Sequence, residues 1–297
     1  MSYIKRLERV NKLNVWNCKK ISDLITSFPL SNQNFDKIKL YIKMYISKAM
    51  EISFLDNDLD FVKLIDQSRN LKNITPNGAV VPKREFLLEY NLILREWREI
   101  IGRIIAPEPS MLNRFRLTPN IRIKFAEEIE ENVNRDLNTA YPHSDAWLEG
   151  PWGMNCYFPV MGDTDHNTLK YYKPQPENFS EDFVKTSKSY KDMQWVMKYF
   201  DEMNFVPKAG TIYFSDYAMI HNTHREKNAG TRISIDSTLY IGENAPHPDR
   251  ESEYEKDFIE IGVEKIFDPG ISVNEKFLEK VSTFSHYTTG KKRIVSL

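Results

Sequence analysis

The sequence predicts an α+β protein in which a β-rich centre, shaped as a sandwich or jelly roll, carries a helical N-terminal region and peripheral helices. Over the first hundred residues, apolar side chains recur at three- and four-residue spacing, which is typical of helices. From about residue 110 to residue 242, apolar and polar residues alternate in short runs between turns, which is typical of strands. We therefore expect a helical region over 1–109, a β core over 110–242 and a C-terminal extension over 243–297.

Helices are predicted over 15–30, 35–54, 58–68 and 84–105. The last of these has the strongest apolar face, and Pro107 and Pro109 follow it, as expected at the end of a helix. A loop is predicted over 71–83, because Asn77-Gly78 is a turn signal. This periodicity is typical of core packing and by itself indicates no chemistry.

Strands are predicted where residues alternate in two-residue steps or form short apolar runs, over 114–117, 121–125, 155–160, 168–172, 211–214 and 232–241. The polar stretch 177–203 is expected to be an insertion between strands, with a helix over 193–200. An acidic run at 127–131 indicates a solvated surface, and a further helix is expected near 274–284.

The charge balance argues against two classes of partner. With 41 basic and 42 acidic residues the formal net charge is −1, so no basic excess indicates nucleic acid or an anionic membrane. Cys18 and Cys156 are the two cysteines, which are too few for a disulfide framework and favour a reducing compartment. The N-terminus has no apolar signal core, and no run of about 18 apolar residues occurs. We expect a soluble, cytoplasmic protein.

Candidate metal ligands lie in two stretches that are far apart in the sequence. His143 and Asp145 are two residues apart, so on an extended strand their side chains would point to the same face. With a distant histidine they would give two imidazoles and one carboxylate, the ligand set of non-heme Fe(II) oxygenases, which leaves three positions open on an octahedral ion. His221 is the preferred third ligand because apolar residues precede it, and His224 is the alternative.

A downstream arginine strengthens this interpretation, because a His-x-Asp pair alone is most often an ordinary surface pair. Arg232 lies on a strand-like run, and Ser234 shares its face at two-residue spacing. An oxygenase that uses 2-oxoglutarate needs a cation for the distal carboxylate of this co-substrate, and a planar guanidinium meets a carboxylate with two hydrogen bonds. Trp147 and Trp152, close to the upstream ligands, indicate a pocket that limits water.

The order His143-Ser144-Asp145, then His221, then Arg232-Ile233-Ser234 resembles the signature of the Fe(II)/2-oxoglutarate-dependent dioxygenases. The stretches 167–174 and 221–232 look like the phytanoyl-CoA-dioxygenase-like branch of that family. The stretches 143–147 and 155–160 are similar to oxygenases of streptomycin-type antibiotic and bacterial sugar pathways. The resemblance covers residues 110–242 and does not extend to either end of the chain.

The resemblance implies a double-stranded β-helix, also called a jelly roll, with Fe(II) bound by His143, Asp145 and His221. It implies that Arg232 holds 2-oxoglutarate and that Ser234 is a second contact. Weaker candidates for the co-substrate or the primary substrate are Asn155, Tyr157, Thr168 and Lys170, and candidates for the pocket rim are Trp147, Trp152 and His224. O₂ would take the last open metal position, and 2-oxoglutarate would leave as succinate and CO₂. The carboxylate of Asp145 favours hydroxylation over halogenation, and desaturation, ring formation and epimerisation are further outcomes within the family. The expected substrate is a small polar metabolite derived from a sugar or an amino acid.

Two other classes of function remain open at the level of sequence. One is a jelly-roll binding module without catalysis, which the intact ligand set disfavours. The other is a metal-dependent cupin-like enzyme that does not use 2-oxoglutarate, in which Arg232 would have no evident role. Asp216 and Asp236 are expected to be structural partners rather than catalysts. The oligomeric state is not predicted.

Overall fold

The computed structural model describes residues 1–14, 18–68, 70–105, 114–116, 118–126, 139–240, 258–260, 269–274 and 291–296. These residues form helices and antiparallel strands. The α-helices are α1 Tyr3–Asn14, α2 Asn32–Met50, α3 Asp58–Ser68, α4 Leu87–Ile105 and the short α5 Ala146–Glu149. The 3₁₀ helices are η1 Arg84–Phe86, η3 Pro176–Asn178, η4 Glu181–Val184 and η5 Lys191–Tyr199. Of these helices, none is both long and apolar enough to cross a membrane.

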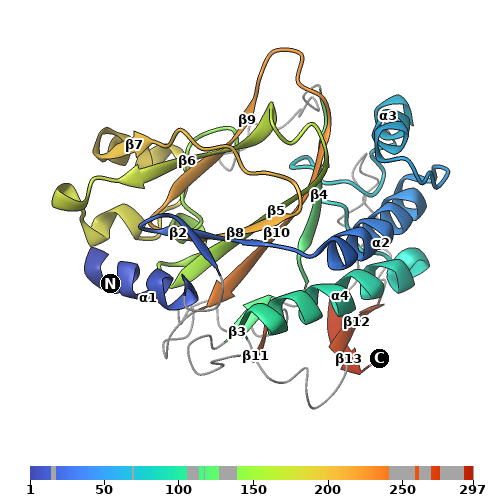
Figure 1. Ribbon diagram of the computed structural model, residues 1–297, viewed down its shortest axis with the longest axis horizontal. Helices are drawn as coiled ribbons and strands as arrows, with labels where there is room; N and C mark the ends of the chain where they lie inside the picture. The colour runs from blue at the N-terminus through green and yellow to red at the C-terminus, as the bar shows by residue number, and fades with distance from the viewer. Residues whose placement is uncertain are drawn as a thin grey trace.

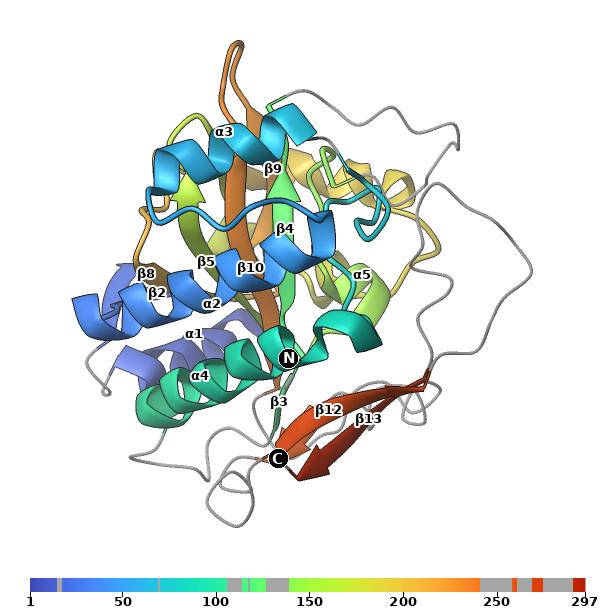
Figure 2. The same ribbon diagram turned by 90° about the vertical axis from the view of Figure 1, so that its right-hand side faces the viewer.

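The strands form two sheets, which enclose the centre of the molecule. Two further strands form a separate hairpin. The large sheet has the order β1-β2-β8-β5-β10-β3-β11, with β4 also paired to β10, and the small sheet has the order β7-β6-β9. The hairpin joins β12 Pro269–Asn274 and β13 Lys291–Ser296, beside α4 (Figure 2). The remaining strands are β1 Lys19–Ser22, β2 Ile25–Pro29, β3 Arg114–Arg116, β4 Asn120–Lys124, β5 Gly153–Gly162, β6 Asn167–Pro174, β7 Phe200–Glu202, β8 Thr211–Asp216, β9 Ile220–Arg225, β10 Arg232–Tyr240 and β11 Phe258–Glu260.

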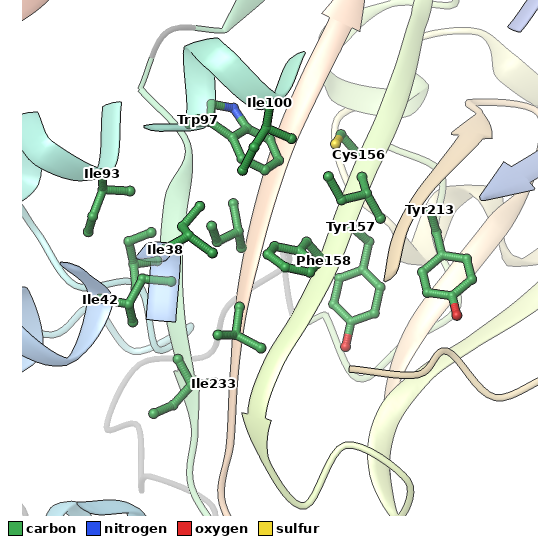
Figure 3. Close-up of a cluster of buried hydrophobic side chains, with 14 of the residues drawn as sticks. Ile38, Ile42, Ile93, Trp97, Ile100, Cys156, Tyr157, Phe158, Tyr213 and Ile233 are labelled. Carbon is green, nitrogen blue, oxygen red and sulfur yellow. The ribbon is translucent and has the colours of Figure 1, made fainter. Parts of the chain in front are cut away.

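Helices α2 and α4 cover one face of the large sheet, and the small sheet lies on the other side (Figures 1 and 2). The helix α2 begins at Ser31, whose hydroxyl accepts a hydrogen bond from the Asn34 amide, and ends at Glu51 in the left-handed conformation. Its apolar stripe and that of α4 meet the apolar face of β5 and β10. Figure 3 shows this layer, with Ile38, Ile42 and Trp97 on one side and Phe158 and Ile233 on the other.

Strand β10 illustrates how the two-residue period divides the large sheet into an apolar and a polar face. Ile233 and Ile235 are fully buried in the core under the helices. Arg232, Ser234 and Asp236 point the opposite way and line a cavity between the two sheets. The same strand therefore anchors the helical layer and supplies polar side chains to the interior of the β structure.

The strand predictions over the β core are confirmed as β3, β4, β5, β6, β8 and β10, and the helix predictions over 35–54, 58–68 and 84–105 are confirmed as α2, α3 and the η1–α4 pair. The turn at Asn77-Gly78 is also present, with Gly78 at a φ of 84°. The helix predicted over 193–200 is a 3₁₀ helix that ends at Tyr199, after which Phe200 begins β7.

The helix predicted over 15–30 is wrong. Helix α1 ends at Asn14, and the following chain forms the β1–β2 hairpin, with a turn at Asp23 and Leu24. Strand β2 pairs along its length with β8, from Ile25 opposite Ser215 to Pro29 opposite Thr211. The β-branched residues of this segment suit a strand, and pairing with a distant strand outweighs the local spacing.

Some predictions lie outside the described residues. These are the acidic run 127–131, the helix-ending Pro107 and Pro109, and the helix near 274–284, except that Asn274 itself ends β12.

Candidate functional site

The two histidines of the site are joined by their own backbones. His143 and His221 form an isolated antiparallel bridge, in which each amide donates to the carbonyl of the other residue at 2.9 Å. The bridge fixes the segment before α5 onto the edge of β9. It places the two imidazole rings with their centroids 4.5 Å apart. Two residues that are far apart in the sequence are thereby held as neighbours.

Asp145 reaches the histidines by a turn and not along a strand, which corrects the expected geometry. Its backbone is helical (φ −64°, ψ −21°), and it immediately precedes α5. Ser144 sets the turn, because its hydroxyl donates to the Tyr217 carbonyl at 2.6 Å and accepts from the Ala146 amide at 3.1 Å. The first turn of the helix then directs the Asp145 carboxylate back towards both imidazoles.

The three side chains converge on one point. The Asp145 carboxylate oxygens lie 3.8 Å from His143 Nε2 and 3.9 Å from His221 Nε2. The three ligand atoms all lie within 4.8 Å of one another, and within the described part of the chain this is the one group of histidine, cysteine or carboxylate side chains with such an arrangement. The geometry can hold a metal ion.

Both histidines are prepared as ligands by their surroundings. His143 Nδ1 lies 2.8 Å from the Tyr141 carbonyl, so Nδ1 carries the proton and the Nε2 lone pair faces Asp145. Burial, together with the neighbouring His221, lowers the pKa of His143 to about 3. Burial also lowers the pKa of His221 to about 4. Both rings are therefore neutral at neutral pH, as metal ligands must be.

The inserted stretch between β6 and β7 covers the site. The Tyr190 ring stacks on the His143 ring with centroids 4.2 Å apart and an interplanar angle of 24°. The Gln194 amide donates to the Pro142 carbonyl at 2.8 Å and to the Tyr190 carbonyl at 2.9 Å, which ties η5 to the ligand segment. Tyr190 thus forms one wall of the cavity.

The metal-ligand group lines a cavity of about 290 Å³ between the large sheet and the β6–β9 pair. Arg232 lies in the same cavity, 1% exposed, with its guanidinium 5.4 Å from the centre of the Tyr157 ring. Its Nε and Nη1 find no hydrogen-bond acceptor among the described residues. Ser234 and Asn155 also line the cavity, as the sequence predicted, and Asn155 Nδ2 has no partner among the described residues.

Strands β4 and β10 carry a ladder of polar pairs into the cavity. The register sets Lys124 opposite Arg232, Arg122 opposite Ser234 and Asn120 opposite Asp236. Arg122 donates to both carboxylate oxygens of Asp236, at 2.7 and 2.9 Å, and Asn120 adds a third hydrogen bond at 3.0 Å. Asp236 is therefore a structural partner, as expected. The sequence did not indicate that Lys124 and Arg122 line a cavity, because Ile121-Arg122-Ile123-Lys124 has the alternating pattern of any half-exposed strand.

Three predicted site residues lie on the outer side of the small sheet. In the β6–β9 register, Tyr171 stands opposite His221 and faces the cavity, whereas Lys170 is opposite Asn222 and Thr168 is opposite His224. Thr168, Lys170 and His224 line a separate groove, where Lys170 pairs with Glu202 at 2.6 Å. The structure does not bring these residues to the metal-ligand group, and the alternative that His224 is the third ligand has no geometric support.

The two tryptophans expected at the rim are also elsewhere. Trp147 is fully buried in a second apolar cluster with Phe183 and Val196, and its indole donates to the Phe183 carbonyl at 2.7 Å. Trp152 contributes its backbone carbonyl to Arg9, at 2.9 Å. Neither side chain lines the cavity. Aromatic residues near a ligand in sequence were a poor guide, because the turn at Asp145 sends Trp147 away from the site.

Comparison with known proteins gives a likeness of fold. No protein-family model matches the sequence, and no curated protein matches it. Among solved structures, the chain resembles the non-heme α-ketoglutarate-dependent carbocyclase SnoK from nogalamycin biosynthesis, with 10% identity over 82% of this chain and 88% of that chain and a TM-score of 0.46. It also resembles AviO1 from Streptomyces viridochromogenes Tue57, with 12% identity over 82% of this chain and 99% of that chain and a TM-score of 0.45.

A third neighbour is an N-substituted L-amino acid dioxygenase from Burkholderia ambifaria AMMD, with 9% identity over 81% of this chain and 90% of that chain and a TM-score of 0.41. Such low identities and TM-scores do not assign an activity, so function has to be inferred from the residues of the site.

Proposed function

We propose that this chain is a non-heme iron oxygenase that uses 2-oxoglutarate and O₂ to hydroxylate a small polar metabolite, derived from a sugar or an amino acid. One observation carries the proposal. A single cavity contains both the His143, Asp145 and His221 group and the buried Arg232 guanidinium, whose Nε and Nη1 have no acceptor among the described residues. A metal-ligand group and an unsatisfied cation in one cavity fit a co-substrate that has a metal-binding end and an anionic end.

The metal-ligand group suits Fe(II). His143, Asp145 and His221 would hold the ion through two neutral imidazoles and one carboxylate, a ligand set that leaves positions open for the keto-acid end of 2-oxoglutarate and for O₂. Iron, when bound, supplies the oxidation chemistry, in which 2-oxoglutarate is decarboxylated to succinate and CO₂. The protein orients the ligands through the Tyr141 carbonyl on His143 and through the Ser144 turn beneath Asp145.

Arg232 suits the distal carboxylate of 2-oxoglutarate, at the end of the co-substrate that does not bind the metal. A buried guanidinium without an acceptor is costly, and an incoming carboxylate would supply the missing hydrogen bonds. Ser234, on the same face of β10, would add a hydroxyl donor. Asn155 lines the cavity as well and is a further candidate contact of the co-substrate or the substrate.

The rest of the cavity would exclude water and admit a small substrate. Its walls include the rings of Tyr157, Tyr171 and Tyr190 and the side chain of Leu169. The volume of about 290 Å³ lies at the small end of the range for small-molecule sites. We infer that the two facing sheets form a double-stranded β-helix over 110–242, which follows the N-terminal region 1–109 and precedes the extension 243–297. The cytoplasmic location stays a prediction.

The alternatives fit the site less well. A binding module without catalysis would not need the convergence of His143, Asp145 and His221. A cupin-like metal enzyme without 2-oxoglutarate would leave Arg232 buried and unsatisfied. No observation on the described residues favours either of them.

Anaerobic titration with Fe(II) and 2-oxoglutarate tests the proposal through the visible charge-transfer band of the chelate. We expect the band in the wild type, its loss in His221→Ala, and a much higher 2-oxoglutarate requirement in Arg232→Ala. His224→Ala is the matched control, because this histidine lies three residues further along β9 on the outer face, and it should behave as wild type. Absence of the band in folded wild-type protein at any concentration would overturn the proposal.

A further inference from the structure

The cavity has a second end, away from Arg232. Asp236 lies four residues beyond Arg232 on the same face of β10, which at about 3.3 Å per residue separates the two by roughly 13 Å. Asn120 on β4 stands opposite Asp236. We call the part of the cavity around Asp236 and Asn120 the substrate end. A co-substrate that joins the metal-ligand group to Arg232 leaves this end for the primary substrate.

Three asparagine side chains line the cavity, and each has hydrogen-bonding capacity that the described residues do not use. Asn155 stands opposite Thr238 on β10, and its Nδ2 is buried without a partner among them. Asn120 donates from Nδ2 to Asp236 at 3.0 Å, but its Oδ1 accepts no hydrogen bond from the described residues. The side-chain amide of Asn77 has no partner there either. A donor, an acceptor and one complete amide are therefore open to a ligand.

Asn77 reaches the cavity from the N-terminal region, outside the β core. The turn at Asn77-Gly78 packs directly on β4, where the Ile123 amide donates to the Gly78 carbonyl at 2.8 Å. Gly78 has a φ of 84°, and a Cβ at this position would collide with the Ile123 carbonyl, so the turn requires glycine. Arg122 Nη1 also donates to the Asn77 carbonyl at 3.1 Å. The backbone of Asn77 is thereby fixed at the cavity wall.

The charged groups at the substrate end already have partners within the chain. Arg122 donates from Nε and Nη2 to Asp236 at 2.7 and 2.9 Å, and from Nη1 to the Asn77 carbonyl. Glu149 accepts a hydrogen bond from the Tyr217 hydroxyl at 2.9 Å. The α-carboxylate of an amino acid would need a cation here, and no uncommitted cation of the described residues lines this end. A neutral substrate with several hydroxyl groups needs none.

We propose that Asn77, Asn120 and Asn155 recognise the hydroxyl groups of a sugar or a similar neutral polyhydroxylated ring, and that this is the class of the primary substrate. The inference rests on the proposed function and narrows its substrate. A carboxamide both donates and accepts hydrogen bonds, as a hydroxyl does, so a set of amides complements a set of hydroxyls. The Tyr190 ring and Leu148 line the same cavity and supply apolar surface for the C–H groups of the ring.

Saturation-transfer NMR on the full chain tests the inference. The protein is loaded with 2-oxoglutarate and with Zn(II) in place of Fe(II), because Zn(II) is not redox-active and binds the same types of ligand. The probes are D-glucose, L-rhamnose and myo-inositol on one side, and L-serine and L-glutamine on the other. In the wild type we expect transfer to the polyhydroxylated probes and none to the amino acids.

Two variants remove the amides without adding charge. Asn77→Ala and the nearly isosteric Asn155→Leu should each weaken binding of the polyhydroxylated probes by about tenfold, which corresponds to the loss of one or two neutral hydrogen bonds. Asn204→Ala is the matched control, because Asn204 is an exposed asparagine in the separate groove on the outer side of the small sheet. It should bind the probes as the wild type does. If Asn155→Leu does not fold, Asn77→Ala decides the comparison.

The outcomes that contradict the inference are definite. Transfer to the amino acids in place of the polyhydroxylated probes, transfer to neither class, or unchanged affinities in the asparagine variants would overturn it. The visible band of wild-type protein with Fe(II) and 2-oxoglutarate is measured in parallel. A band without binding of the polyhydroxylated probes refutes the sugar site alone, whereas absence of the band means that the proposed function itself fails.

Discussion

Two regions of this protein contain buried arginine side chains, and only one of the two supplies them with a carboxylate partner among the described residues. Arg6 and Arg9 on α1 both bind Asp216 at the end of β8, with Arg6 Nη1 2.6 Å from one carboxylate oxygen and Arg9 Nη2 bonded to the other. Their remaining Nη groups donate to the carbonyls of Pro151 and Trp152. Arg232 is as deeply buried, yet it has no carboxylate partner among the described residues and keeps two nitrogens unsatisfied.

The difference separates a structural role from a functional one. The Asp216 cluster fastens the N-terminal helix to the large sheet, and its charges are compensated within the chain. The Arg232 region is left uncompensated in a cavity that also contains a metal-ligand group. Stability should therefore depend on the first region, and binding of an anion on the second. The following predictions test that division.

The largest expected effect is on stability, from Asp216→Asn. This change leaves Arg6 and Arg9 buried without a carboxylate, and breaking a buried pair in this way costs about 3–5 kcal/mol in the free energy of unfolding. Urea denaturation followed by circular dichroism measures it. In protein that remains folded, affinity for 2-oxoglutarate should stay at the wild-type value. If Asp216→Asn lowered the affinity for 2-oxoglutarate without lowering the free energy of unfolding, the assignment of a structural role to the Asp216 region would be wrong.

Arg232→Met should show the opposite pattern. Loss of a bidentate, charge-assisted contact should weaken 2-oxoglutarate binding by about 100-fold. The free energy of unfolding should stay the same or increase, because an unsatisfied buried cation is replaced by an apolar side chain of similar length. Calorimetric titration and urea denaturation of the same preparation measure both quantities. A destabilised variant with unchanged affinity would show that Arg232 is a structural residue.

The pH dependence of stability should also separate the regions. Arg9 and Arg6 hold the pKa of Asp216 below its ordinary value of 3.8, despite the opposing effect of burial. Above about pH 4, the Asp216 carboxylate therefore contributes its full stabilisation to the folded protein. This stabilisation is lost as pH falls below about 4, because the unfolded chain then takes up a proton more readily than the folded protein. Between pH 5 and pH 2, the free energy of unfolding should fall more steeply in wild type than in Asp216→Asn. Parallel curves for the two proteins would contradict this assignment.

The smallest expected effect is that of Tyr190→Phe. The ring would still stack on His143 and the segment would remain tied to Pro142 by Gln194, so Fe(II) affinity should change less than about threefold. Tyr190→Ala should weaken Fe(II) binding more, by about tenfold, because the wall over the ligand ring is removed. Competition with a coloured chelator measures both variants. Equal affinities in the two variants would show that stacking on His143 does not support the metal-ligand group.

The sequence alone determined most of the elements and the identity of the metal-ligand group. Period-two alternation specifies β4 and β10. The order His143, Asp145, His221, Arg232 could be read without coordinates, because residue type limits which side chains can bind a metal or a carboxylate. Strand β2 escaped prediction because a short segment of mixed spacing is decided by its partner, here β8.

Only the tertiary structure decided which side chains share a cavity. The turn at Ser144 brings Asp145 to the histidines and carries Trp147 into the core, which no spacing rule on a strand would give. The β6–β9 register sends Lys170 and His224 to the outer face and Tyr171 to the inner one. The β4–β10 register places Lys124 against Arg232. The physical reason is that sequence periodicity fixes how side chains alternate along an element, whereas pairing register and turn geometry fix which faces meet.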